Sequence, residues 1–222
     1  MLELPLFPLN TVLFPGTPID LYIFEPRYRL MVKNCLESKS PFGVVLIHNG
    51  QEADGPLAEP YADGCTARII KVSQVNEQGH LSLSAIGEER FHILSLNQEQ
   101  SYLTGQVECT PLEGPLSPEV IQGAHAINRQ VLQYLRLLSQ LSKEDLNLSE
   151  LVMPEEALSI LYLSAAMLQI PASEKQPLLS SETADGLLSQ LERIYRREIA
   201  LLARQISRGK DETDPRQIGW NN

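Results

Sequence analysis

The stretch LPLFPLNTVLFPG, residues 4–16, decides the fold of this 222-residue chain. The apolar residues at its beginning belong to the segment Leu2–Leu6, which predicts a short β-strand. A second strand is predicted at Ile19–Ile23. The prolines between these strands stiffen a long connection and lower the entropy lost when it is ordered. Gly16 supplies a residue that accepts a positive φ at a turn. The segment therefore predicts two strands joined by a stiff, tightly turned loop.

The rest of the first half predicts a sheet interrupted by one helix. The helix, Glu25–Ser38, begins at the Glu25-Pro26 step and carries an apolar stripe at helical spacing. Further strands are predicted at 43–49, 65–75, 80–85, 91–96 and 102–111. Neither face of the 65–75 segment is cleanly polar, which suits a barrel strand covered on both sides. Residues 49–64 are expected to form a long loop without secondary structure.

The second half predicts helices. A breaker at 112–115 precedes Ser117-Pro118-Glu119, which has the cap, first-turn proline and acidic residue of a helix start. Helices are predicted at 118–141, 154–169, 187–208 and, in a short form, from Ser173. The class is therefore α+β. The expected division is a β-rich part at 1–114, a helical bundle at 115–208 and a flexible tail at 209–222.

Composition and charge exclude several classes of binding partner. Hydrophobic residues make up 43% of the chain and charged residues 21%, as in ordinary globular proteins. The net charge of −10 argues against DNA, RNA or anionic lipid as a general partner, because those surfaces require a basic face. Three separated cysteines without a CxxC pair indicate reduced thiols. The start lacks the features of a signal peptide, and no apolar run is long enough to span a membrane, so a cytoplasmic protein is expected.

No catalytic or metal-binding pattern is present in the sequence. It has no Walker A motif, no GxGxxG after a strand and no GxSxG elbow. Its four histidines never pair at the spacing that zinc ligands require. The sequence therefore predicts no catalytic residue, no metal and no cofactor.

Several spaced motifs resemble those of the Lon protease N-terminal domain family. Residues 4–16 and the later LYIFEPRY, residues 21–28, resemble the family's opening signature, and GEERF, residues 87–91, resembles its G-x-x-R-F motif. The resemblance extends over about residues 2–205 and keeps the family's order. The motif residues to which it assigns a structural role are Pro15, Gly16, Glu25, Pro26, Arg27, Tyr28, Arg90 and Phe91.

The resemblance implies a PUA-like β pseudo-barrel with one early helix, followed by a C-terminal α-helical bundle. It also implies recognition of unfolded or tagged protein substrates. Because the chain ends before any ATPase or Ser/Lys peptidase part, proteolysis is not carried over. We expect a non-catalytic adaptor or client-recognition factor in protein quality control, with a separate ATPase or protease as a candidate partner. RNA binding is the alternative, since PUA-like folds include RNA-binding relatives, but the acidity counts against it. An unrecognised small-molecule enzyme is the third hypothesis.

Two loops are expected to frame a groove for an extended apolar peptide. The candidate contacts are Phe7 and Phe14 in the proline-rich segment and Leu57 and Tyr61 in the 49–64 loop. The competing interpretation is architectural, with the phenylalanines capping the barrel. Arg27 is expected to pair with a carboxylate such as Glu25 or Glu89. The basic segment 193–210 is interpreted as a solvated helix face or, alternatively, as a docking patch for an acidic partner.

Overall fold

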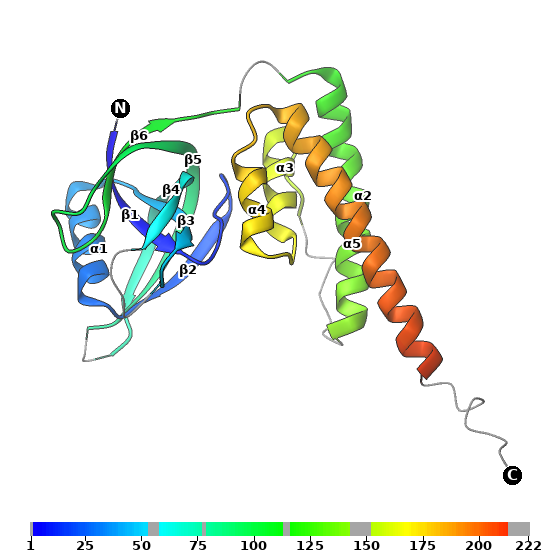
Figure 1. Cartoon of the computed structure of the whole chain (residues 1–222), viewed down its shortest axis with the longest axis horizontal. Coiled ribbons are helices and arrows are strands. Elements are labelled where there is room, and N and C mark those ends of the chain that lie inside the picture. The colour runs from blue at the N-terminus through cyan, green and yellow to red at the C-terminus, as the bar shows by residue number, and fades with distance from the viewer. Residues whose placement is uncertain (1, 53–57, 77–78, 113–115, 143–151, 213–222) are drawn as a thin grey trace, which may run out of the picture.

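The computed structural model describes residues 2–52, 58–76, 79–112, 116–142 and 152–212. A β-rich part with one helix lies beside a helical part (Figure 1). The predicted α+β class is confirmed. The predicted boundary at residue 114 lies outside the described residues. Helix α5 extends through Glu212, into the segment predicted to be a flexible tail, and residues 213–222 lie outside the description.

The strands close into a barrel. They are β1 (Leu2–Leu9), β2 (Pro18–Ile23), β3 (Phe42–Asn49), β4 (Glu59–Gln74), β5 (Leu81–Asn97) and β6 (Thr104–Cys109). They form a six-stranded sheet in the order β2-β5-β4-β3-β1-β6, and β6 also pairs with β5. Closure depends on the length of β5, whose first half pairs with β2 and whose second half pairs with β6. Strand β2 lies outside the closed ring as an edge strand.

Two strand predictions are corrected. The segments expected at 80–85 and 91–96 are one continuous strand, β5. Strand β4 begins at Glu59, so residues 59–64 of the expected loop are strand, whereas residues 53–57 lie outside the described part. The turn-forming composition of 59–64 is overridden because β3 and β5 pair with this segment on both sides. Gly64 is required there, since an added Cβ would lie 2.5 Å from the ring of Phe91.

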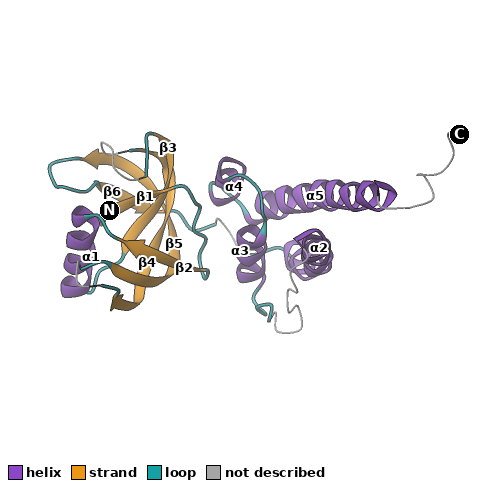
Figure 2. Ribbon diagram, turned by 90° about the horizontal axis from the view of Figure 1, so that it is seen from below, coloured by secondary structure: helices purple, strands orange, loops and turns teal. Residues whose placement is uncertain are grey.

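Helix α1 (Pro26–Ser38) covers one side of the barrel (Figure 2). It begins at Pro26, one residue after the predicted Glu25, which is its N-cap. Its apolar stripe buries Tyr28, Met31, Val32 and Cys35, whereas Leu36, also predicted in the stripe, is exposed. The ring of Tyr28 stacks on Phe7 of β1 at 4.1 Å between centroids. The helix is therefore fixed through the same signature segment that forms the first strand.

The helical part contains, among the described residues, α2 (Pro118–Ser142), α3 (Ala157–Met167), α4 (Ala172–Leu179) and α5 (Ala184–Glu212). The long helices α2 and α5 pack along each other, and α3 and α4 lie between them and the barrel (Figures 1 and 2). Helix α3 is apolar on nearly every face and is buried, as its sequence predicts.

The barrel and the helices share one hydrophobic cluster. Val12, Phe14 and Leu46 of the barrel belong to the same cluster as the buried side chains of α2, α3, α4 and α5. The side-chain amide of Gln176 in α4 also donates to the carbonyl of Asp63 in β4, at 3.0 Å. We call this contact region between the two parts the seam.

A turn at residues 14–17 connects the signature segment to the seam. Gly16 has a φ of +74°, which confirms the positive φ predicted for it. Its amide donates to the carbonyl of Gly87 in β5 at 2.8 Å, and the amide of Gly87 donates to the carbonyl of Thr17 at 2.9 Å. An added Cβ at Gly87 would lie 2.3 Å from the carbonyl oxygen of Phe14. The glycine of the GEERF motif therefore allows the turn to lie directly on β5.

Candidate functional site

Two of the predicted peptide contacts lie in the core. Phe7 is buried between strand β1 and helix α1, and Phe14 is fully buried in the seam. Neither side chain offers a surface to a peptide in this structure. Their positions agree with the architectural interpretation, in which the aromatic rings stabilise the junction of strand, helix and turn.

The other two predicted contacts come from the 49–64 segment. Tyr61 is half-buried on β4, where it contacts His48 edge to face at 4.9 Å between centroids and packs against the shared hydrophobic cluster. Leu57 lies outside the described residues. The structure therefore does not bring the predicted peptide contacts together as one exposed groove within its described part.

The motif residues around α1 hold the start of that helix. Nη2 of Arg27 lies 2.9 Å from Oε2 of Glu25, which confirms one of the two carboxylates expected as its partner. The guanidinium also lies over the ring of Tyr28, 4.7 Å from the centroid. Burial raises the pKa of Tyr28 to about 12, and the charge of Arg27 acts in the opposite direction. This group fixes the end of β2 relative to α1.

An exposed aromatic cluster lies beside that group. Tyr22 and Phe24 are 54% and 39% exposed, with ring centroids 6.3 Å apart. The hydroxyl of Tyr22 lies 2.7 Å from Nδ1 of His80, whose ring also meets Phe24 edge-on. We call Tyr22, Phe24 and His80 the aromatic patch. It borders a hollow of about 100 Å³ lined by Phe7, Tyr22, Ile23, Phe24, Glu25, Tyr28 and Glu52.

Neither Tyr22 nor Phe24 was among the predicted peptide contacts. The signal was the spacing of Tyr22 and Phe24, since residues two apart on an extended segment point to the same side. His80 joins them only through the pairing of β2 with β5, and a single sequence does not reveal that register.

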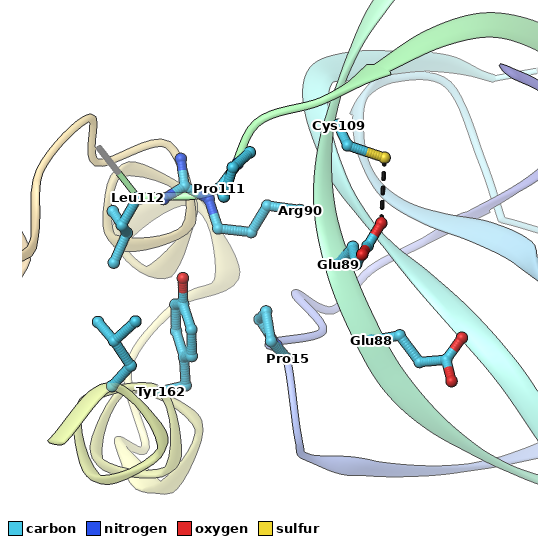
Figure 3. Close-up of a pocket in the computed structure, with 9 residues that line it drawn as sticks. Pro15, Glu88, Glu89, Arg90, Cys109, Pro111, Leu112 and Tyr162 are labelled. Carbon is cyan, nitrogen blue, oxygen red and sulfur yellow. Dashed lines mark hydrogen bonds between the residues drawn. The ribbon is translucent and has the colours of Figure 1, made fainter. Parts of the chain in front are cut away.

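A second hollow, of about 230 Å³, opens at the seam (Figure 3). It is lined by Pro15, Glu88, Glu89, Arg90, Cys109, Pro111, Leu112, Leu158 and Tyr162. We call it the seam hollow. Four segments meet there: the turn after Phe14, strand β5, the chain leaving β6, and helix α3. Pro15 and Arg90, two residues of the resemblance motifs, therefore meet at one hollow.

Arg90 is the unusual group in the wall of the seam hollow. It is 7% exposed, and its Nε and Nη1 atoms have no hydrogen-bond partner among the described residues. The hydroxyl of Tyr162 points toward the guanidinium (Figure 3). Burial raises the pKa of Tyr162, and the charge of Arg90 acts in the opposite direction. The next residue, Phe91, points into the barrel core, because successive strand residues face opposite sides.

The acidic residues beside Arg90 have other partners. Glu88 forms an ion pair with Arg68, and Oε2 of Glu89 accepts a hydrogen bond from the thiol of Cys109 at 3.2 Å. Both carboxylates point away from the guanidinium in Figure 3. Arg90 is thus a buried cation without a carboxylate bound to it in the described part of the chain.

The basic segment of α5 is partly neutralised. Arg197 forms ion pairs with Glu174 of α4 and with Glu198, at 2.6 and 2.8 Å. These contacts tie α5 to α4 on an exposed face, where such pairs add little stability. The docking patch considered for this segment stays a prediction.

In the ranges that the structure describes, no group of three or more His, Cys, Asp or Glu side chains is placed to hold a metal ion. None of the helices in those ranges combines the length and apolar character needed to cross a membrane.

The chain is similar to Lon proteases over nearly its whole length. The Lon protease of Anaeromyxobacter dehalogenans is 30% identical over 208 residues, which cover 91% of this chain and 24% of that protein. Lon protease 2 of Myxococcus xanthus is 31% identical over 186 residues, which cover 82% of this chain and 22% of that protein. The chain thus spans about a quarter of the length of these relatives.

Two solved structures have the same fold. The crystal structure of a Lon N-terminal domain protein from Xanthomonas campestris has a TM-score of 0.62 and 26% identity, covering 87% of this chain and 97% of that one. The N-terminal domain of Mycobacterium avium complex Lon protease has a TM-score of 0.63 and 15% identity, covering 89% and 98%. The family model for the ATP-dependent protease La (LON) substrate-binding domain matches residues 3–197, and the chain therefore belongs to that family.

Proposed function

We propose that this chain is a non-catalytic module that binds exposed, extended apolar segments of client proteins. The observation that carries the proposal is the match to the Lon substrate-binding domain over residues 3–197. A role as an adaptor or client-recognition factor in protein quality control, in the cytoplasm and with a separate ATPase or protease, is part of the proposal.

The aromatic patch is the surface that suits such clients best. Tyr22 and Phe24 expose large apolar area at low cost in side-chain entropy, as residues at binding surfaces commonly do. Strand β2, which ends beside them, has β5 as its strand neighbour in the described sheet and lies at its edge. An extended client segment can add to such an edge through backbone hydrogen bonds while its side chains contact the aromatic rings.

Binding to a labelled, permanently unfolded protein, followed by fluorescence anisotropy at low and high salt, tests the proposal. We expect saturable binding with a Kd of about micromolar order that survives high salt, because the contact is apolar. The double variant Tyr22→Ala/Phe24→Ala is expected to weaken binding about tenfold or more. Leu201→Ala, which removes an exposed apolar side chain from α5, is the matched control and should bind as the parent does.

Two outcomes would count against the proposal. Absence of saturable binding to any unfolded protein would contradict client recognition itself. Binding that falls steeply with salt would favour an electrostatic partner, RNA included, over an apolar client.

A further inference from the structure

We propose that the seam hollow is a subsite for the C-terminal residue of a client, with the α-carboxylate held by Arg90 and the apolar side chain held by the surrounding walls. The inference rests on the proposed client-binding function. It adds a second contact site and names the chemical group of the client that binds there. It concerns residues at the seam, whereas the aromatic patch lies at the end of β2.

The first argument is the cost of burying Arg90. A buried polar group without a hydrogen-bond partner loses its interaction with water and gains nothing in return, and the loss is greater for a charged group. Arg90 is 7% exposed, and two of its nitrogen atoms lack partners among the described residues. Residues kept in so costly a state are commonly part of binding or catalytic sites.

The second argument is charge. Glu88 and Glu89 are engaged by Arg68 and Cys109 and point away from the guanidinium (Figure 3). Arg90 also borders a neighbouring hollow of about 380 Å³, which is lined by the carboxylates of Asp63 and Glu182. Oδ1 of Asp63 lies 2.7 Å from Nδ1 of His92, and neither carboxylate forms an ion pair with Arg90 among the described residues. Burial raises the pKa of the neighbouring phenol, Tyr162, while the charge of Arg90 and its hydrogen bond to that phenol act in the opposite direction. The guanidinium of Arg90 and the hydroxyl of Tyr162 are therefore available as hydrogen-bond donors for one anion.

The third argument is the combination of apolar walls and size. Pro15, Pro111, Leu112 and Leu158 give the hollow that Arg90 lines an apolar wall. The volume of about 230 Å³ is below the range of about 300–1,000 Å³ typical of pockets for drug-sized ligands. It suits one amino-acid residue that carries both an apolar side chain and a carboxylate.

A chain terminus fits this geometry better than an internal acidic residue or a phosphate. An internal residue needs room for the chain to enter and leave, whereas a terminal residue needs one path. A phosphate carries more charge and three acceptor oxygens, which require more donors than one guanidinium and one phenol provide. Among common anions, the α-carboxylate of an apolar C-terminal residue matches the donors and the walls together.

The test compares two peptides that differ in one group. A short fluorescein-labelled peptide ending in leucine is prepared as the free acid and as the C-terminal amide, and each is titrated with the full chain. We expect the acid to bind about tenfold more tightly or better, since hydrogen bonds to a charged group are the strong ones. The labelled unfolded protein is titrated in parallel, so that client binding is measured independently of the terminus.

The variants locate the effect and separate it from folding. In Arg90→Met the ratio of acid to amide affinity should fall to about one, while thermal stability should be retained or increased, because an unpaired buried charge is replaced by an apolar chain. Tyr162→Phe should lower the ratio by a smaller factor. Arg204→Met, which removes an exposed arginine from α5, should leave the ratio unchanged.

Each adverse result has one meaning. Equal affinity for acid and amide, with normal binding of the unfolded protein, overturns the carboxylate subsite and leaves the proposed function standing. A ratio that persists in Arg90→Met overturns the assignment to Arg90. Failure of the chain to bind either peptide or the unfolded protein overturns the proposed function together with this inference.

Discussion

At the scale of single residues, Gly16 and Gly87 differ in what each glycine provides. Gly16 supplies a positive φ with open space around its Cα, whereas Gly87 supplies room for the carbonyl of Phe14. We expect Gly16→Ala to cost about 1 kcal/mol of the free energy of unfolding, from backbone strain. Gly87→Ala should cost clearly more, about 2–4 kcal/mol, because the turn must leave β5. Urea unfolding of both variants checks this order, and an equal or reversed cost would contradict it.

Buried thiols make stability depend on alkaline pH. Burial raises the pKa of Cys65 from 9.0 to about 12 and that of Cys35 from 9.0 to about 11. In the unfolded chain these thiols ionise above their ordinary pKa, while in the folded chain they stay protonated. The free energy of unfolding should therefore fall as pH rises above 9.0, by up to about 1.4 kcal/mol per pH unit for each thiol.

Urea unfolding across that pH range measures the slope. Cys65→Ala should show a shallower fall than the parent, whatever its stability at neutral pH. A parent slope that is flat between pH 9.0 and about 11 would contradict the burial of these thiols.

At the scale of elements, the C-terminal end of α3 is held by side chains from other helices. The last carbonyl groups of a helix have no partner within it. The hydroxyl of Tyr195 in α5 donates to the carbonyl of Ser164 at 2.6 Å, and Nζ of Lys175 in α4 donates to the carbonyl of Ala166 at 2.9 Å. The hydroxyl of Tyr134 in α2 accepts from the amide of Gln169 at 2.8 Å. Three helices thus position α3, whose other end borders the seam hollow.

We expect Tyr195→Phe to lower the free energy of unfolding by about 1–3 kcal/mol, because it leaves a buried carbonyl with one partner fewer and fills the same space. Chemical denaturation measures the loss. Tyr162→Phe is the matched control, since the hydroxyl of Tyr162 faces a hollow, and it should cost less (Figure 3). Equal costs for the two variants would show that the Tyr195 hydroxyl has no special role at the end of α3.

Elements that carry their own pattern could be predicted from the sequence, and those that depend on a distant partner could not. The apolar stripe of α1 and the all-round apolar character of α3 depend on local spacing and were predicted correctly. The strand at 59–64 depends on pairing with β3 and β5, and was predicted as loop. The seam hollow was missed for the same reason, since Pro15, Arg90 and Tyr162 come from three separate segments.

At the scale of the whole molecule, the shared hydrophobic cluster joins the barrel to the helices. Because Val12, Phe14 and Leu46 pack among side chains of the helical part, separating the two parts would expose both surfaces to water. The division at residue 114 is therefore proposed as a division of architecture, and we expect the two parts to unfold together.

Native-state hydrogen exchange of the variant Leu187→Ala tests this expectation. Leu187 is fully buried in α5, far in sequence from every strand, and its truncation should cost about 2–5 kcal/mol. If the molecule unfolds as one unit, the most protected amides of β3 lose as much protection as those of α3, because both exchange through global unfolding. If β3 keeps its protection while α3 loses it, the helices open separately. The seam, with its buried Arg90, would then be a surface that such an opening exposes to clients.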